Sequence, residues 1–255
     1  MSDDFDYGVD PNELGGGGST FKNPEVGDHN AVLRSLIQCG NFREEYKGER
    51  KPVAPQVVAI FELKGEENYE EDGITPLTLE KTFPLKKGDK AFLTKFRKTL
   101  DPKGECKNFA QMIGKPCTVT ARGSKAVGED GKPKYINFGG MSGLTTNKQM
   151  LAFMESNGLL TLEQEGVGFV KFDEMTKEAI LELNPILHVA DIIMKGENYE
   201  GSKAQEIIEE IRKENHDFAK RKPKDDEGSE EGSSSSSEET PPPPPPCDMD
   251  ESQEF

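Results

Sequence analysis

The residues Gln56-Val-Val-Ala-Ile-Phe-Glu-Leu63 decide the fold that this sequence predicts. They form a compact run rich in β-branched side chains, which favours a strand. Residues 29–41, before this run, are also rich in aliphatic side chains, and residues 77–85, after it, alternate apolar and polar over several positions. We therefore expect three strands before residue 86.

A helix and two further strands follow in the sequence. Phe92, Leu93, Phe96 and Leu100 fall on one helical face, so residues 90–100 are expected to form a helix after Asp89. Residues 117–121 and 134–138 are expected to be paired strands, because the Glu-Asp-Gly-Lys tip in the segment that joins them is a hairpin signal. Three strands, a helix and two strands are the element order of an OB-fold, although other small antiparallel β/α modules share this order.

The sequence changes character after residue 145. Asn147 is expected to cap a helix over 148–157 that turns Met150, Leu151 and Met154 inward. Two more helices are expected over residues 185–195 and 202–217, the latter with Ile207, Ile208 and Ile211 on its apolar side. The predicted fold class is therefore α+β, with an OB-like five-stranded β-barrel in residues 21–145, a helical extension in 146–222, and disordered acidic ends in 1–20 and 223–255.

The net charge of −16 is unevenly distributed along the chain. Residues 1–20 carry −5 and residues 223–255 carry −10, whereas residues 21–145 carry +4. Five acids of this last region fall in the single short segment 66–72, and without them it carries +9. A basic module between acidic ends is typical of a protein that binds a polyanion. The alternative is an acidic protein whose charges serve only solubility.

Several other classes of protein are not indicated by the sequence. Cysteines 39, 106, 117 and 247 have no CxxC spacing, and only three histidines accompany them, so neither a metal site nor another cofactor is predicted. There is no HExxH motif, P-loop or complete nucleophile elbow, so we expect no enzymatic activity. The first residues lack the pattern of a secretory signal, and no apolar stretch is long enough to span a membrane. We therefore expect a cytoplasmic protein without a membrane association.

Two segments combine aromatic side chains with cations, as single-stranded nucleic acid requires. Rings stack on bases and cations follow the phosphates, so the two kinds of residue together predict binding with little sequence preference. In an OB-fold these segments would be the loop between strands 1 and 2 and the hairpin between strands 4 and 5, where such folds hold oligonucleotides. The alternative is that Phe42 and Phe138 are core residues and the lysines are ordinary surface residues. The candidate DNA-binding residues are Phe42, Arg43, Tyr46, Lys47, Arg50, Lys51, Arg122, Lys125, Lys132, Lys134, Tyr135 and Phe138.

The chain ends in the acidic sequence Cys247-Asp-Met-Asp-Glu-Ser-Gln-Glu-Phe255, which follows a polyproline run at 241–246 and a Ser/Glu-rich stretch at 225–240. Such a linker cannot bury a core. An acidic tip that ends in Phe resembles the end of prokaryotic and bacteriophage single-stranded-DNA-binding proteins. The polyproline run and the large helical segment depart from that class. The tail residues expected to bind a partner are Asp248, Asp250, Glu251, Glu254 and Phe255.

This resemblance implies a protein that coats and protects single-stranded DNA during replication, recombination and repair. It further implies that the tail recruits replication proteins, such as a DNA polymerase, a helicase or primase, or a nuclease, in the host cytoplasm if a phage encodes the chain. Assembly into a homo-oligomer is possible within this class. The alternatives are an acidic adaptor or assembly chaperone that binds basic proteins, and an enzyme subunit without an active site of its own.

Overall fold

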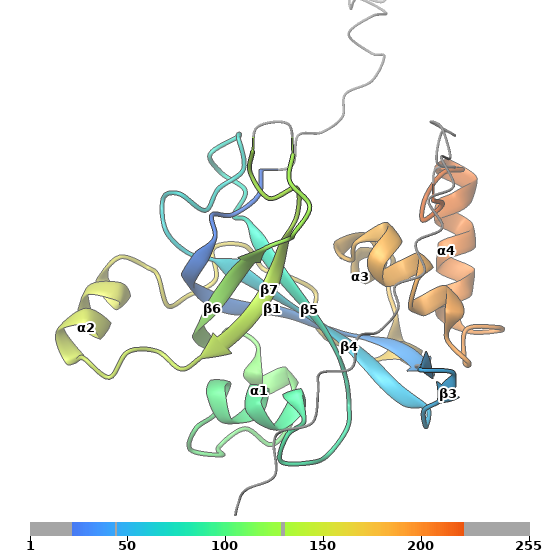
Figure 1. The fold of residues 1–255 in the computed structure, drawn as a ribbon, viewed down its shortest axis with the longest axis horizontal. Helices are drawn as coiled ribbons and strands as arrows, with labels where there is room; N and C mark the ends of the chain where they lie inside the picture. The colour runs from blue at the N-terminus through green and yellow to red at the C-terminus, as the bar shows by residue number, and fades with distance from the viewer. Residues whose placement is uncertain (1–21, 44, 129–130, 222–255) are drawn as a thin grey trace, which may run out of the picture. The chain divides into compact units, whose positions relative to one another are not determined.

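The computed structural model describes residues 22–43, 45–128 and 131–221 (Figure 1). The strands are β1 (Gly27–Phe42), β2 (Glu45–Tyr46), β3 (Glu49–Arg50), β4 (Ala54–Leu63), β5 (Thr78–Pro84), β6 (Pro116–Gly123), β7 (Ile136–Ser142) and β8 (Gly168–Val170). The α-helices are α1 (Phe92–Leu100), α2 (Lys148–Ser156), α3 (Lys177–Glu182) and α4 (Lys203–Glu214). Shorter helical turns are η1 (Ala110–Met112), η2 (Phe172–Glu174), η3 (Pro185–Ala190) and η4 (Ile193–Lys195). The expected acidic ends, 1–20 and 223–255, lie outside the described residues.

Five strands form an antiparallel, nearly closed barrel in the order β5-β4-β1-β6-β7 (Figure 1). The central strand β1 pairs with β6 from Gly27 to Val32 and with β4 from Ala31 to Phe42. The pairing of β1 with β4 is irregular between Leu33 and Ser35, and such a bulge bends the strand that carries it. The irregularity follows Val32, the last residue of β1 that pairs with β6. β5 and β7 are the two ends of this order, and their described residues form no backbone ladder with each other. We call the boundary between β5 and β7 the seam.

The element order confirms the predicted α+β fold class with an OB-like barrel. The three strands β1, β4 and β5 precede α1, and β6 and β7 follow it. The expected boundary near residue 145 falls between β7 and α2. The strand that was expected from residue 134 begins at Ile136, and the first strand extends beyond the expected residues at both ends.

The barrel interior is filled by alternate residues of the strands and closed by α1. Val57, Ala59, Phe61 and Leu63 of β4 point into this core. α1 adds Phe96, whose ring centroid lies 5.2 Å from that of Phe83 on β5. The intervening residues of β4 are buried as well, because they face the helical extension. This burial on both faces explains why the sequence of β4 is a continuous apolar run rather than an alternating one.

The helical extension covers the outer face of β1 and β4. Ile37, Val58 and Ile60 on that face belong to a second apolar core that contains residues of α3, η3 and α4. Gly40 of β1 has a φ of 86°, and a Cβ there would lie 2.8 Å from Asn198 Oδ1 and 2.9 Å from the Phe172 ring. Glycine is therefore needed where the extension approaches β1 most closely. The extension also adds β8, which pairs in parallel with β1 at Ser35–Ile37.

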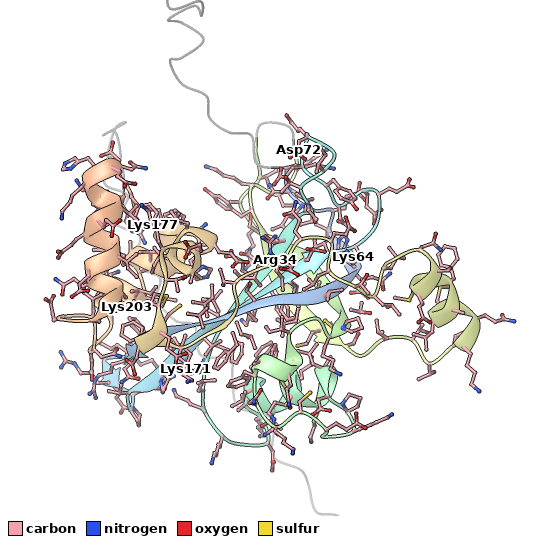
Figure 2. All side chains as sticks on the ribbon, turned by 180° about the vertical axis from the view of Figure 1, so that it is seen from behind. Arg34, Lys64, Asp72, Lys171, Lys177 and Lys203 are labelled. Atoms are coloured by element: carbon pink, nitrogen blue, oxygen red, sulfur yellow. The ribbon has the colours of Figure 1, made fainter. Side chains whose placement is uncertain are left out.

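Buried polar contacts fasten the extension to the barrel. Lys64 Nζ lies 2.8 Å from both Glu62 Oε1 and Glu163 Oε1, and the side chains of Glu62 and Lys64 are fully buried. The backbone N–H groups of Glu163 and Gln164 also donate to the Glu62 carboxylate. Figure 2 shows Arg34 and Lys64 within the barrel region, and Arg34 Nε lies 3.2 Å from Glu182 Oε1 of α3.

Several expectations for the extension were wrong in detail. α3 and β8 were not predicted. Residues 185–195 do not form one helix but a π-helical turn, η3, and a 3₁₀ turn, η4. Within the π-helical turn, His188 and Val189 are both buried. In α2, Met154 is buried but Met150 is 50 % exposed, because α2 contributes to neither apolar core and turns only part of its expected face inward.

No helix in the described ranges combines the length and the apolar character that crossing a membrane requires.

Candidate nucleic-acid interface

The first predicted segment is a short β-hairpin rather than an irregular loop. β2 and β3 pair, and the turn between them is made by Lys47 and Gly48, both with positive φ (53° and 77°). Such a turn matches the right-handed twist of paired strands. Lys47 and Arg50 are exposed, Lys51 and Phe42 are half-buried, and the Tyr46 side chain lies outside what the structure describes.

Arg43 has an acidic partner within the protein. Its Nε lies 2.6 Å from Glu197 Oε1 of the helical extension, and this contact raises the pKa of the Arg43 guanidinium. Both side chains are partly exposed, so the pair adds little stability. It nevertheless occupies the guanidinium that was expected to contact phosphate. Glu197 is 154 residues away in sequence, which is why sequence reasoning missed the pair.

The second predicted segment presents an exposed aromatic ring on an anchored backbone. The Ser124 N–H donates to the Tyr135 carbonyl at 2.8 Å, and the Tyr135 N–H donates to Ser124 Oγ at 3.2 Å. The Tyr135 side chain is nevertheless 56 % exposed, and Lys134 Nζ lies 5.6 Å from its ring centroid. The remaining predicted cations of this segment, which share its exposure, are Arg122, Lys125 and Lys132.

Phe138 lies at the seam, where its ring packs partly against the barrel core. Its ring stacks on buried Phe61, with centroids 5.7 Å apart, and meets the edge of Phe92 at 5.8 Å. It is half-buried and packs against the barrel core. Phe138 is therefore a core residue on one side of its ring. The residue is still partly exposed, so the alternative of a DNA-binding role stays a prediction.

Lys81 is a residue of the seam that sequence reasoning missed. Its Nζ lies 5.7 Å from the Phe92 centroid and 5.9 Å from the Phe138 centroid, within the range of cation–π attraction. On β5, Lys81 lies two residues from each of the core residues Leu79 and Phe83, so it belongs to the same, inward face of the strand. A cation at an inward strand position was the sequence signal that could have identified it.

The two predicted segments lie at opposite ends of β1. The β2–β3 hairpin follows Phe42, whereas Gly27 at the other end pairs with Ala121, next to the 123–135 loop. A strand rises about 3.3 Å per residue, so 16 residues place the segments some tens of ångströms apart. The structure brings the predicted residues of each segment together but does not join the two sets. β5 runs between them, from Thr78 opposite Glu62 to Pro84 opposite Gln56 (Figure 1).

The outer face of the second and third barrel strands, β4 and β5, is the usual oligonucleotide face of an OB-fold. Here the extension covers it, since Val58 and Ile60 are buried under α3, η3 and α4. On β5, Glu80 Oε2 lies 3.2 Å from His188 Nδ1 of η3. Burial raises the pKa of Glu80 to about 7, with a further contribution from Glu182, and burial lowers the pKa of His188 to about 4. Among the described residues, the surfaces that the extension leaves open include the seam, Tyr135 with its neighbours, and the α1 end of the barrel.

The described ranges contain no group of three His, Cys, Asp or Glu side chains placed to hold a metal ion. The expected partner-binding residues Asp248, Asp250, Glu251, Glu254 and Phe255 lie outside the described residues. Comparison with protein-family models, with curated proteins and with solved structures finds no match for this chain.

Proposed function

We propose that this protein binds single-stranded DNA, coats it during replication and recombination, and recruits replication proteins through its acidic C-terminal tail. The observation that carries the DNA-binding part is the exposed Tyr135 ring beside Lys134 on a backbone that Ser124 holds in place. An exposed ring on an anchored backbone can stack on a base at little entropic cost, and the neighbouring ammonium can contact the adjacent phosphate.

The seam supports the same function, because it adds further groups of the same two kinds. Lys81, Phe92 and Phe138 place a cation next to two partly exposed rings, on the side of the barrel that the extension leaves open. Tyr135 and Phe138 are three residues apart and so point to opposite faces, but β7 is an end of the strand order, so a nucleic-acid strand that stacks on Tyr135 can cross the edge of β7 to reach this group. Such contacts need no particular base, so the proposed binding tolerates any sequence.

A binding measurement with oligo-dT tests this proposal. The protein is expected to prefer single strands to duplex, and its affinity is expected to fall steeply with salt, because counterions are released from the phosphates. Tyr135→Ala is expected to weaken oligo-dT binding by about 1–3 kcal/mol. Phe153→Ala is the matched control, since Phe153 is an equally exposed aromatic residue (58 %) on α2, and it is expected to leave affinity unchanged.

Equal affinity for duplex and single strand, or equal losses in the two variants, would reject the proposed interface. Binding of basic proteins without DNA binding would instead favour the acidic adaptor or assembly chaperone.

The recruitment part of the proposal rests on the sequence of the tail. A terminal ring can add about 1.5–3 kcal/mol when it is fully enclosed in a partner's pocket, and the α-carboxylate beside it can accept hydrogen bonds from an arginine. Deletion of Phe255 is therefore expected to abolish capture of a replicative DNA polymerase while oligo-dT affinity is preserved. Capture that survives this deletion but is lost on deletion of residues 241–246 would transfer the role to the polyproline run.

A further inference from the structure

The most basic part of the chain lies outside the two predicted segments. Residues 86–115, which contain α1, carry nine Lys or Arg and three Asp or Glu, a net charge of +6. This exceeds the +4 of the whole region 21–145, so the basic character of the barrel is concentrated around α1. Sequence reasoning treated these cations only as the polar side of an amphipathic helix.

Among the described residues, the cations of α1 form no ion pair with an acid. Lys95, Arg97 and Lys98 are exposed, and within the described part of the chain the ion pairs join other residues. The nearby acid Asp101 is engaged elsewhere, because its carboxylate accepts hydrogen bonds from the backbone N–H groups of Glu105 and Cys106. These bonds lower the pKa of Asp101, and they shape the turn that follows α1.

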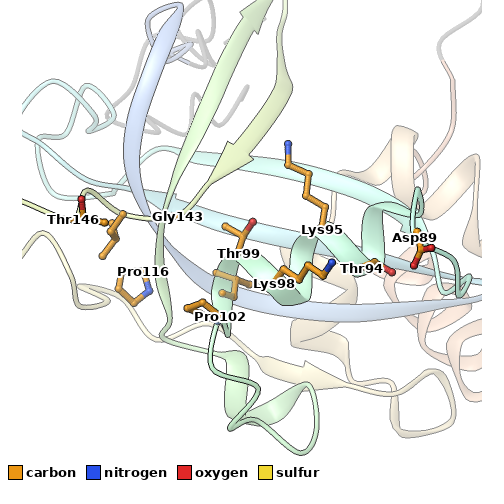
Figure 3. A pocket seen from close by; sticks show the side chains of 11 residues that line it. Asp89, Thr94, Lys95, Lys98, Thr99, Pro102, Pro116, Gly143 and Thr146 are labelled. Carbon is orange, nitrogen blue, oxygen red and sulfur yellow. The ribbon is translucent and has the colours of Figure 1, made fainter.

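A groove runs between α1 and the segment that follows β7. Its volume is about 700 Å³, and Lys95, Lys98 and Thr99 line it on the α1 side, opposite Pro116 and Thr146 (Figure 3). A second hollow of about 450 Å³ lies on the α1 surface beside Lys87, Arg97 and Lys103. The groove therefore offers two ammonium groups and several hydroxyl donors against the single carboxylate of Asp89, together with apolar residues that include Leu100 and Pro102. This combination suits a chain that alternates phosphates with less polar sugars and bases.

Two elements, α1 and β7, reach both the groove and the seam. Phe92, the first residue of α1, touches Phe138 of β7. The opposite wall of the groove begins at Gly143, directly after β7 ends at Ser142. A nucleic-acid strand that follows β7 from Tyr135 past Phe138 therefore reaches α1. The usual route over β4 and β5 is closed by the helical extension.

We propose that the groove beside α1 is a second contact region for the same strand of single-stranded nucleic acid that binds at Tyr135 and the seam. Lys95 and Lys98 contact its phosphates there. This inference rests on the proposed function, and it extends the binding track beyond the residues that the loops supply. The shared elements α1 and β7 favour the same strand over a separate acidic protein, because a protein ligand would not need both regions.

The test compares short and long oligo-dT, since only a long strand reaches both regions. Oligonucleotides of roughly 8 and 24 nucleotides lie within and above the usual site of about 4–16 nucleotides for such a barrel. Lys95→Glu/Lys98→Glu is expected to weaken binding of the long oligonucleotide about tenfold, and to reduce the slope of log affinity against log salt by about 1 for each lost phosphate contact. Binding of the short oligonucleotide is expected to change less than about twofold, because it is held at Tyr135 and the seam.

Lys203→Glu/Lys213→Glu is the matched control, because it makes the same change in net charge with two exposed lysines of α4. It is expected to leave both affinities nearly unchanged. Equal losses in the two double variants, or equal losses for both oligonucleotides, would overturn the inference and leave only a general effect of charge. Normal binding of both oligonucleotides by Lys95→Glu/Lys98→Glu would also overturn it.

These outcomes are separable from failure of the proposed function. If the wild-type protein binds neither oligonucleotide, both the proposed function and the second contact region are rejected. If the wild type binds both and the α1 variant shows no length-dependent loss, only the second contact region is wrong. Lys95→Gln/Lys98→Gln removes the charges without reversing them, so a smaller loss of the same kind is expected, and urea unfolding verifies that each variant is folded.

Discussion

Charged residues are placed differently on the face of the barrel that the extension covers and on its open side, which includes the seam and α1. Under the extension, charges are buried and matched to partners, as in the group of Glu62, Lys64 and Glu163. On the open side, the cations of α1 are exposed and have no ion-pair partners among the described residues. Removing one partner from a buried pair leaves an uncompensated charge, whereas changing an exposed charge costs the fold little. The comparison indicates that the charges of the covered face contribute to stability, and it is compatible with the proposed binding at the open side.

Removal of Lys64 is the strongest test of the covered face. Lys64→Met leaves the fully buried Glu62 carboxylate with only two backbone N–H donors, so the free energy of unfolding is expected to fall by about 3–5 kcal/mol. Urea unfolding measures this loss. The control Glu62→Gln/Lys64→Met removes both charges together and is expected to recover much of the stability. A loss below about 1 kcal/mol in the single variant would show that this group of charges does not hold the extension.

The apolar part of the covered face is tested at Ile180 of α3. Ile180 is fully buried against the outer face of the barrel, so Ile180→Ala is expected to cost about 2–5 kcal/mol of unfolding free energy. Its neighbour Leu181 is 55 % exposed, and Leu181→Ala is expected to change stability by less than about 0.5 kcal/mol. Under conditions where the Ile180 variant remains folded, its oligo-dT affinity is expected to equal that of the wild type. Similar losses in the two variants would contradict the assigned packing.

The barrel was predictable from sequence because its signals are local. The runs that became β1, β4, β5 and α1 have the composition or periodicity of their element within a few residues of chain. β8 and α3, with three and six residues, are too short to show a period. The continuous apolar run of β4 is compatible with a strand buried on both faces, but the run does not show which segment of the chain covers the second face.

The candidate interface was predictable only in part. Tyr135 and Lys134 were identified because a ring and a cation adjacent in sequence stay adjacent in space. Lys81 and Phe138 lie on strands far apart in the chain, so their proximity depends on how the barrel closes. The same is true of the pairing of Arg43 with Glu197, which only the folded chain reveals.

The pH dependence of stability tests the Glu80–His188 contact under the extension. Glu80 has a raised pKa, about 7 in place of 4.5, so unfolding releases a proton between these values and rising pH favours unfolding. His188 has a lowered pKa, about 4 in place of 6.5, so unfolding takes up a proton and rising pH favours folding. The two effects oppose each other between pH 4.5 and 6.5, where the pair is expected to add almost no net slope to the stability.

Two single variants separate these opposing contributions. In Glu80→Gln only His188 remains, so stability relative to the wild type is expected to rise as pH increases from 4.5 to 7. At about 1.4 kcal/mol per pKa unit, the relative change is on the order of 3 kcal/mol. His188→Asn leaves only Glu80 and is expected to show the opposite slope. Parallel pH profiles for the wild type and both variants, measured by urea unfolding, would mean that neither group is titrated in the way that burial predicts.

The smallest effect on stability is expected for a substitution of Lys95, which tests the open side of the barrel. Lys95 is exposed near the middle of α1, with Lys98 one turn away, so Lys95→Glu removes a like-charge contact and adds a favourable one. Its unfolding free energy is expected to stay within about 0.5 kcal/mol of the wild type. Lys98 lies in the last turn of α1, where a cation interacts favourably with the helix dipole, so Lys98→Glu is expected to cost about 0.3–1 kcal/mol. If Lys95→Glu instead destabilised the protein as strongly as Lys64→Met, its charge would serve the fold, and the division between the two sides of the barrel would be wrong.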